Sequence, residues 1–358
     1  MTKTIAIIGS HGLYANYGGW DELVNNLAER KPEDTHYIVF NSADAPPHKQ
    51  IPEGITVRQL KLRADGYQGI LYDFWSIFES YWKVDAILLL GVQGIPIVPF
   101  LRLFKKVRIV SNVGGIEWLR PKFGFLQKQY LKWCFNLSMV YSSIVILDNS
   151  YHLDFVPKKI KAKVKVLPYG GEIDTSLEIT EELEQKYPFI RSDYFLSVSR
   201  VLEDNQIAPL CESFVNSKYM LVLISNLSTS QYGKQILQDY GNLPNIVLID
   251  GLYIKPELDL VRRHCKAYIH THTLCGTAPS LVEMMIAQRP LISIDNPQNR
   301  FTLQGEGYLF TSFPQVHQLL NRGEDLSRYI ASREVCDRYS WQRVVKEYES
   351  CFNPLNIQ

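Results

Sequence analysis

The chain has 358 residues, of which 46% are hydrophobic, 21% charged and 12% aromatic, and this composition excludes a disordered, collagenous or low-complexity protein. The length exceeds what a single hydrophobic core comfortably organises and therefore indicates two domains. Thirty-eight Lys and Arg against 37 Asp and Glu give a net charge of +1, which argues against a dedicated nucleic-acid-binding protein.

The first half of the chain alternates apolar, β-branched runs with helical patterns. A strand expected at 4–9 is followed by a loop with glycines and by an amphipathic helix at 20–30. Further strands are expected at 37–40, 55–60, 86–90, 107–111, 143–148 and 164–167. Continuous apolar strands between helices are typical of a parallel sheet that is covered on both faces.

The same pattern restarts after an acidic connector at 180–186, which is expected to be helical. Strands are predicted at 194–199, 220–225, 246–249, 267–270 and 290–294, with a helix at 278–288. The sequence thus predicts an α/β protein with two doubly wound, Rossmann-like domains, 1–175 and 176–335. A final helix within 336–358 could pack back on the first domain. Ligands of such sheets bind beyond the carboxyl ends of the strands.

The small net charge hides an asymmetry along the chain. Residues 101–165 hold 13 Lys and Arg against three acids, a balance of +10, whereas the remainder carries −9. This segment indicates a surface that meets an anionic partner, although a merely solvated face has the same composition. Trp118, Phe123, Phe125 and Trp133 interleave there with Arg120, Lys122, Lys128 and Lys132. The pattern fits single-stranded nucleic acid or a membrane surface, and equally an amphipathic helix with its aromatic side chains in the core.

Three sequence features bear on the compartment of the protein. The six cysteines show neither a C-x-x-C pair nor a spacing typical of zinc sites or disulfides. The apolar run at 86–101 is too short and too interrupted to cross a bilayer. Residues 4–9 fit a strand better than the apolar part of a secretory signal. We therefore expect a cytoplasmic protein.

Two loops between a strand and a helix could hold an anion. The first such loop joins the strand at 4–9 to the helix at 20–30 and contains Gly9, Gly12, Gly18 and Gly19. It lacks the sequence motifs of dinucleotide-binding and phosphate-binding loops, and its glycines could equally serve a tight turn.

The second loop, at 275–283, reads Cys-Gly-Thr-Ala-Pro-Ser-Leu-Val-Glu. Thr277 or Ser280 could cap the following helix, whose first amides would face a phosphate. Glu283 could hold the vicinal hydroxyls of a ribose, although Ser280 and Glu283 also fit a capping box.

Other polar residues follow the predicted strands of the second half. Arg200 comes after the strand at 194–199, where a guanidinium suits a pyrophosphate and a surface ion pair is the alternative. His270 and His272 share one face of a strand, but no partner carboxylate for a metal is evident. The sequence contains no Asp-x-Asp pair, so a diphosphate bridged by metal through that motif is not expected.

Four stretches together resemble the two-domain, GT-B-fold retaining glycosyltransferases, and specifically the rhamnosyltransferase-like branch of bacterial surface-polysaccharide biosynthesis. They lie at 15–20, 112–120, 268–283 and 295–300, in the order of the family and in both halves of the chain. The resemblance implies a hexosyltransferase that needs no cofactor and no metal. Its second domain would bind a nucleotide-sugar donor and its first domain the acceptor.

The resemblance also implies roles for individual residues. Donor and nucleotide binding falls to Gly18, Gly19, Arg200, Asn205, Gly276, Thr277, Ser280, Glu283, Asn296 and Asn299. Among these, Arg200 and the amides after Gly276 would hold the diphosphate and Glu283 the ribose. His272 and Glu117 are the catalytic candidates, His272 near the sugar and Glu117 at the acceptor hydroxyl. Arg120, Lys122, Lys128 and Lys132 would face the acceptor and the membrane.

The sequence departs from the family pattern in three places, two single positions and one stretch. Cys275 stands where many relatives have the first acid of Glu-x7-Glu, and Gly114 stands where the branch usually has Asp. Glu117 is consequently the only carboxylate of the stretch at 112–120. The stretch at 198–206 keeps Arg200 and Asn205 but little else of the pattern.

The expected function is transfer of a sugar, for example L-rhamnose from dTDP-L-rhamnose, with retention, onto a lipid-linked saccharide. The resemblance places this reaction at the inner face of the cell membrane, in capsule, O-antigen or exopolysaccharide synthesis, on an anionic membrane surface and without nucleic acid. Two alternatives stay open. One is a catalytically silent nucleotide-sugar-binding partner of an active transferase, suggested by Gly114 and Cys275, and the other is a nucleotide-sugar epimerase on the same scaffold.

Overall fold

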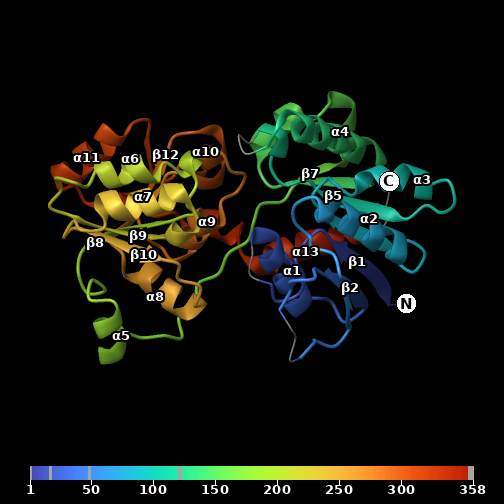
Figure 1. Cartoon of the computed structure of the whole chain (residues 1–358), viewed down its shortest axis with the longest axis horizontal. Helices are drawn as coiled ribbons and strands as arrows, with labels where there is room; N and C mark the ends of the chain where they lie inside the picture. Colours follow the sequence, from blue (N-terminus) through green and yellow to red (C-terminus); the bar gives the residue numbers. More distant parts are fainter. Residues whose placement is uncertain (1, 16–17, 47–49, 120–122, 354–358) are drawn as a thin grey trace. The chain divides into compact units, whose positions relative to one another are not determined.

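The computed structural model describes residues 2–15, 18–46, 50–119 and 123–353, which form two compact units (Figure 1). Unit 1 comprises Met1–Gly170 and Trp341–Gln358, and unit 2 comprises Gly171–Ser340. Unit 2 is thus one continuous segment, and unit 1 is built from both ends of the chain. The boundaries expected from the sequence, after 175 and after 335, each lie five residues inside unit 2.

The sheet of unit 1 is parallel throughout, and its seven described strands follow the order β3-β2-β1-β4-β5-β6-β7. The strands are Lys3–Ile8 (β1), Thr35–Asn41 (β2), Ile55–Gln59 (β3), Ala86–Leu90 (β4), Arg108–Asn112 (β5), Ile144–Leu147 (β6) and Val164–Val166 (β7). Every residue of β4 is buried, because helices cover both faces of the sheet.

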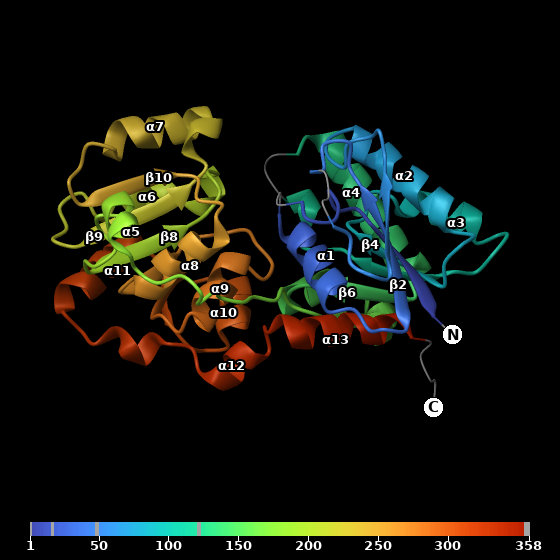
Figure 2. The ribbon, with the colours of Figure 1, turned by 90° about the horizontal axis from the view of Figure 1, so that it is seen from below.

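Two sets of helices enclose the sheet of unit 1. One face packs against α1 (Gly19–Glu29) and α13 (Trp341–Phe352). The other packs against α2 (Gln68–Ser80), α3 (Val98–Leu101) and α4 (Phe125–Tyr141). Figure 2 shows α13, coloured red, alongside the strands of unit 1. Trp341, Val344 and Tyr348 of α13 belong to the same core as Ile5 and Val110, so the expected return of the final helix is confirmed.

Unit 2 contains a second parallel sheet, whose six described strands follow the order β10-β9-β8-β11-β12-β13. The strands are Tyr194–Val198 (β8), Met220–Ser225 (β9), Ile246–Asp250 (β10), Ala267–His270 (β11), Leu291–Ile294 (β12) and Tyr308–Phe310 (β13). One face is covered by α8 (Lys255–His264), α9 (Pro279–Ile286), α10 (Pro297–Leu303) and α12 (Arg333–Asp337). The opposite face is covered by α6 (Ile207–Glu212), α7 (Gln231–Tyr240) and α11 (Phe313–Arg322).

Short helices complete the two units. The acidic connector forms α5 (Glu181–Lys186), which Thr180 caps through its side chain. The 3-10 turns are Ile95–Ile97 (η1), Glu117–Leu119 (η2), Ser150–Phe155 (η3), Lys158–Lys163 (η4), Glu203–Asn205 (η5), Leu227–Thr229 (η6) and Leu326–Tyr329 (η7). No helix within the described ranges is both long and apolar enough to cross a membrane.

The two doubly wound, Rossmann-like domains expected from the sequence are confirmed. Every predicted strand is present, with bounds that differ by at most two residues. The sequence pattern did not single out α2 or the short strand β13. The parallel topology places the carboxyl ends of all strands in a unit at one edge of its sheet, and this edge holds the candidate site.

Candidate functional site

The neighbouring strands β8, β11 and β12 of unit 2 carry the predicted donor residues at their carboxyl ends. The loop after β8 contains Arg200, the loop after β11 contains His272, and Asn296 follows β12. Because parallel strands end at the same edge of a sheet, three loops that are distant in sequence meet there. Hydrogen bonds between them define the geometry of the site.

Backbone and side-chain bonds join the first two of these loops. Asn205 is buried, and its Nδ2 donates to the Arg200 carbonyl at 2.7 Å. The carbonyl of Asn205 accepts from the Thr271 hydroxyl at 2.5 Å, and the amide of Thr273 donates to the Asp204 carbonyl at 3.1 Å. Asn205 therefore supports the loop of Arg200 through the backbone, whereas Arg200 itself is exposed.

Two asparagines hold the loop after β11 from the side of β12. Asn296 caps α10, since its Oδ1 accepts from the Asn299 amide at 2.8 Å, and its Nδ2 donates to the His272 carbonyl at 3.0 Å. Asn299 is fully buried and donates to the carbonyls of Ile294 at 3.0 Å and His272 at 3.4 Å. Asn296 and Asn299, which were both predicted to bind the nucleotide-sugar, thus hold the backbone carbonyl of His272 in place.

The imidazoles of His270 and His272 lie against each other, with ring centroids 4.3 Å apart. Burial lowers the pKa of His272 to about 4, and the nearby charge of Arg200 adds to the effect. Burial, followed by the neighbouring His272, lowers the pKa of His270 well below its usual value. Both rings are therefore neutral near pH 7. Within the described residues, the Nε2 atom of each ring is buried without a hydrogen-bond partner, which leaves it available to a ligand.

Helix α9 begins at Pro279, and its N-cap residue Ala278 makes no side-chain cap bond. The expectation that Thr277 or Ser280 caps this helix is therefore wrong, and Ser280 and Glu283 form no capping box, because the helix begins before Ser280. Ser280 lies in the first turn of the helix. Gly276 and Thr277 are buried just before the helix. The N-terminal amides of α9 and the helix dipole favour an anion at this end.

Glu283, one turn into α9, pairs with a buried arginine of α8. The Oε2 atom of Glu283 lies 2.5 Å from Nη2 of Arg262, while Nη1 of Arg262 donates to Asp259 at 2.7 Å. The side chain of Arg262 is 5% exposed and that of Glu283 17%, so Glu283 is the more accessible member of the pair. The sequence interpretation missed Arg262, whose spacing from Asp259 on an amphipathic helix was the available signal.

Gly18 and Gly19 lie at the start of α1 in unit 1. Gly18 is the N-cap residue with an extended backbone, and its amide donates to Asp21 at 3.3 Å. Asp21 also accepts from the amide of His11 at 2.8 Å, so one buried carboxylate organises the loop between β1 and α1. Residues 16 and 17 of the expected motif lie outside the described residues.

Glu117 begins the turn η2 after β5 and is half-buried. Gly114 lies three residues before it, at a position where the resemblance predicts Asp. Gly114 has a φ of +60°, and a Cβ atom there would lie 3.3 Å from the Trp20 ring. An aspartate would be strained at this backbone conformation. The amide of Gly114 is instead held by Oδ1 of Asn112 at 2.8 Å.

The basic and aromatic residues at 118–133 divide between the core and the surface. Trp118 packs on Phe135 with ring centroids 4.6 Å apart, whereas Phe125 and Trp133 are 74% and 51% exposed. Lys128 is half-buried on α4 and Lys132 is exposed. Arg120 and Lys122 lie outside the described residues. The expectation of aromatic side chains in the core thus holds for Trp118, whereas Phe125 and Trp133 lie at the surface.

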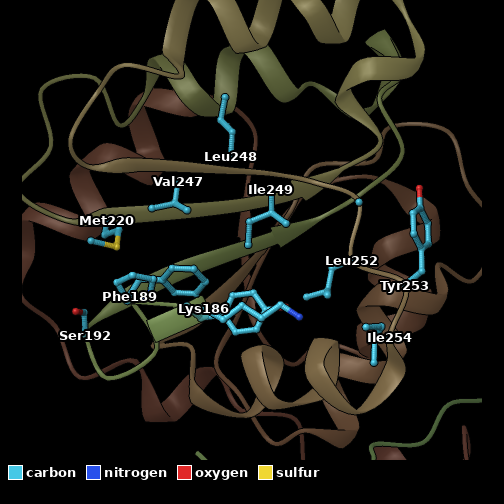
Figure 3. Close-up of a pocket in the computed structure, with 13 residues that line it drawn as sticks. Lys186, Phe189, Ser192, Met220, Val247, Leu248, Ile249, Leu252, Tyr253 and Ile254 are labelled. Atoms are coloured by element: carbon cyan, nitrogen blue, oxygen red, sulfur yellow. The ribbon is translucent and has the colours of Figure 1, made fainter. Parts of the chain in front are cut away.

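A groove of about 860 Å³ lies elsewhere in unit 2, along the edge strand β10 (Figure 3). Its lining is mainly apolar and includes Phe189, Met220, Ile249 and Leu252. None of the predicted donor residues lines it. A diphosphate needs cations and amides, so we place the candidate donor site at the strand ends and not in this groove.

Solved structures of known proteins are similar to this chain in fold. Sucrose-phosphate synthase from Thermosynechococcus elongatus is 13% identical over 98% of each chain, with a TM-score of 0.76. The Anabaena protein HepE in complex with UDP and glucose is 14% identical over 98% of this chain and 99% of its own, with a TM-score of 0.73. The chain has the GT-B fold.

Two further comparisons complete this result. An E. coli structure described as trehalose-6-phosphate bound with UDP-2-fluoro glucose is 12% identical, with a TM-score of 0.71 over 98% of this chain and 99% of its own. Residues 2–172 match a family described as a domain of unknown function, DUF1972. No curated protein matches the chain in sequence. These likenesses establish the fold, and the chemistry must be argued from the residues of this chain.

Proposed function

We propose that the protein is a glycosyltransferase that takes a sugar from a nucleotide-sugar donor. One observation carries the proposal: the exposed Arg200 follows β8, and helix α9, which begins after the neighbouring strand β11 and carries the partly exposed Glu283, starts at the same edge of the sheet. In this arrangement Arg200 and the helix amides bind the diphosphate, and Glu283 accepts hydrogen bonds from the ribose hydroxyls. HepE, which has the same fold, is described in complex with UDP and with UDP-glucose, and this supports a nucleotide-sugar as the donor.

The proposed reaction is a front-face displacement with retention. The bond between the sugar carbon and the diphosphate oxygen breaks, while the acceptor oxygen bonds to the same face of that carbon. The acceptor proton passes to the departing diphosphate. Arg200 and the amides of α9 stabilise the negative charge that develops on this leaving group. No metal is needed for this step, because these groups supply the positive potential.

His272 and Glu117 take different parts in the proposal. Because burial holds the pKa of His272 at about 4, its neutral ring serves to hydrogen-bond the sugar and not to carry a positive charge. We assign Glu117, the carboxylate after β5 of unit 1, to the acceptor hydroxyl. The proposed sugar is L-rhamnose from dTDP-L-rhamnose.

An exposed apolar surface on unit 1 is the observation that favours a membrane-bound acceptor. Helix α2 is apolar on its exposed face as well as on its buried face, where Tyr72 and Ile77 join the core. It buries Asp73 and Ser76, which are fully inaccessible, while Leu71, Trp75 and Phe78 are 59%, 56% and 49% exposed. These three exposed residues recur at helical spacing and form one stripe. Exposed apolar surface of this kind marks an interaction site.

The stripe continues onto α3 and the turn after it. Phe100 and Phe104 are 59% and 65% exposed, and their ring centroids are 5.4 Å apart. The ring centroids of Trp82 and Phe104 are 6.2 Å apart. Nζ of Lys105 donates a hydrogen bond to the backbone carbonyl of Trp82. We call Leu71, Trp75, Phe78, Trp82, Phe100, Leu103 and Phe104 the aromatic face. Lys83, Lys105 and Lys106 are exposed beside it.

Aromatic rings bordered by lysines suit the interface of a bilayer with anionic headgroups. We propose that the aromatic face rests on an anionic membrane, with Lys128 and Lys132 of α4 adding positive charge. The acceptor would then be a lipid-linked saccharide at the cytoplasmic face, in capsule, O-antigen or exopolysaccharide synthesis.

A thermal-shift panel of nucleotide-sugars tests the donor site. A ligand at 100 times its dissociation constant stabilises a protein by about 2.7 kcal/mol, so the correct donor raises the melting temperature. Arg200→Ala should abolish this shift for diphosphate ligands. Arg191→Ala, which removes an exposed arginine paired with Glu184, should leave it unchanged. A panel without any stabilising nucleotide-sugar would refute the proposed donor site.

Product identification separates the proposal from its alternatives. The protein is incubated with the stabilising donor and a lipid-linked saccharide, and transferred, hydrolysed and isomerised sugar are all quantified. A new glycosidic product supports the transferase, and an isomerised donor supports an epimerase. Donor binding with neither product supports a silent partner of another transferase.

A further inference from the structure

A cluster of three metal-ligand side chains lies at the end of β11 in unit 2. His270, His272 and Cys275 each offer one ring nitrogen or sulfur, and these atoms all lie within 4.8 Å of one another. His270 ends the strand, His272 follows in the loop, and Cys275 precedes α9. The backbone of this loop is held by Asn296, Asn299 and Asp204, as described above, so the three side chains project from a fixed segment.

The environment of the two histidines suits a metal ion. A ring nitrogen of an imidazole that carries no hydrogen has a lone pair to offer a metal ion. The Nε2 atoms are buried and lack partners within the described residues, although buried polar atoms normally find one. Nδ1 of His270 lies 3.4 Å from the Tyr268 hydroxyl. A hydrogen bond on the second nitrogen is the usual means by which a metal-binding histidine is oriented.

The distances require only a small contraction around an ion. Zinc takes bonds of about 2.0–2.1 Å to histidine and about 2.3 Å to cysteine, and tetrahedral geometry then places the ligand atoms roughly 3.3–3.6 Å apart. The three atoms are already within 4.8 Å, so side-chain rotation can bring them to these separations. Two nitrogens and one sulfur are a donor set that zinc accepts, with a fourth position open to water.

We propose that His270, His272 and Cys275 form a binding site for a zinc-type divalent ion. The Cys275 thiol, which contacts Oδ1 of Asn299 at 3.8 Å, releases its proton to solvent when the sulfur binds the ion. The ion is not a cofactor of the sugar transfer proposed above. It occupies the loop that precedes α9, and on the basis of the proposed function it excludes the donor diphosphate from that loop.

Cobalt(II) added to the metal-free protein tests the site directly. Coordination by a thiolate gives an intense ligand-to-metal absorption band, and we expect this band to saturate at one equivalent. Cys275→Ser should abolish the band. His272→Gln should weaken binding at least 100-fold, since even loss of a supporting group around a metal site costs about 10- to 100-fold. His317→Gln, at an exposed histidine of α11, should bind like the unmodified protein.

A second measurement needs no variant. Cys275 is the one cysteine of the six that is not buried, so alkylation of the folded protein reports on this residue. Zinc should protect it, and a chelator should restore the reaction. Peptide mapping by mass spectrometry identifies the modified cysteine.

Three outcomes would overturn the metal site: no thiolate band, alkylation of Cys275 that is insensitive to zinc, or binding that persists in both Cys275→Ser and His272→Gln. The overlap with the donor is tested separately. The stabilising nucleotide-sugar should displace cobalt and bleach the band. Simultaneous binding would refute the overlap and leave the metal site intact, whereas failure of every nucleotide-sugar to bind would refute the proposed function alone.

Discussion

Arg262 and Glu283 form an ion pair of 2.5 Å between α8 and α9, beside the candidate donor site. The guanidinium is buried and also binds Asp259, which in turn accepts from the amide of Asp174 at 2.9 Å and from Lys255 at 2.8 Å. This network ties the first residues of unit 2 to both helices. It orients the carboxylate that we assign to the ribose.

Glu283→Gln should weaken nucleotide binding by roughly 10- to 100-fold. The amide keeps the size of the side chain but removes the charge, and hydrogen bonds to charged groups contribute about 1.5–3 kcal/mol. Isothermal titration with the nucleotide identified by the thermal-shift panel measures the change. Glu257→Gln, on α8 but paired with Lys186, is the matched control. An unchanged dissociation constant for Glu283→Gln would refute the ribose assignment.

Arg262→Met should act on folding and not only on binding. It removes the cation from a buried pair and leaves Asp259 and Glu283 without it, a change that costs about 3–5 kcal/mol in comparable buried pairs. Urea unfolding of the full chain measures this loss. The exposed Arg300, which pairs with Asp295, gives the control Arg300→Met, expected within about 1 kcal/mol of the unmodified protein. Equal stability of the two variants would contradict the structural role of Arg262.

Asp73 should make the stability of the protein fall as the pH rises. Complete burial raises its pKa from 3.8 to about 8, and the side chain of Gln93 offsets only part of this. The folded state therefore holds the proton more tightly than the unfolded state, and stability declines between pH 3.8 and about 8.

Asp73→Asn removes this dependence and should stabilise the protein at neutral pH by up to about 4 kcal/mol. Unfolding free energies of the variant and the unmodified protein, measured across that pH range, should converge at its acidic end. A constant difference at every pH would show that the carboxyl does not titrate as proposed.

The aromatic face can be tested with vesicles. Trp75→Ser combined with Phe78→Ser and Phe104→Ser should reduce binding to anionic vesicles more than tenfold at both low and high salt, because about 1.4 kcal/mol of lost apolar burial is already tenfold. Lys105→Gln with Lys106→Gln should reduce binding at low salt alone, by roughly fivefold for each cation. Tyr253→Ser, at a residue of unit 2 that is 78% exposed, is the control. If the triple variant floats with anionic vesicles to the same extent as this control, the aromatic face is not the membrane contact.

The strands were predictable from the sequence because their signals are local. The buried run at Ala86–Leu90 can be recognised without knowledge of its neighbours. Helix α2 shows the limit of such signals, since it buries Asp73 and Ser76 and exposes Trp75. Because apolar residues lie on both the buried and the exposed face of this helix, periodicity does not single out the face that meets the core. The strand β13 has three residues between turns, too few for any period to register.

The location of the candidate site could be predicted from the sequence, but the contacts that its side chains make could not. The rule that ligands bind at strand ends brought Arg200, His272 and Asn296 together. Packing decided the remainder: Asn205 and Asn299 bond backbone carbonyls, and Arg262 reaches Glu283 only because α8 lies beside α9. The approach of Cys275 to His270 likewise depends on how the loop after β11 folds.

The chain enters and leaves unit 2 at adjacent points. The amide of Gly171 donates to the Tyr339 carbonyl at 2.8 Å, and Gly171 pairs with Ser340. On the side of unit 1, a Cβ atom at Gly170 would lie 2.6 Å from the Trp341 ring. Unit 2 is therefore inserted as one continuous segment into the chain of unit 1. A short linker between 170 and 341 would close unit 1 without unit 2, and 171–340 would be the natural limits of a gene fragment for unit 2 or of its exchange for the corresponding part of a relative.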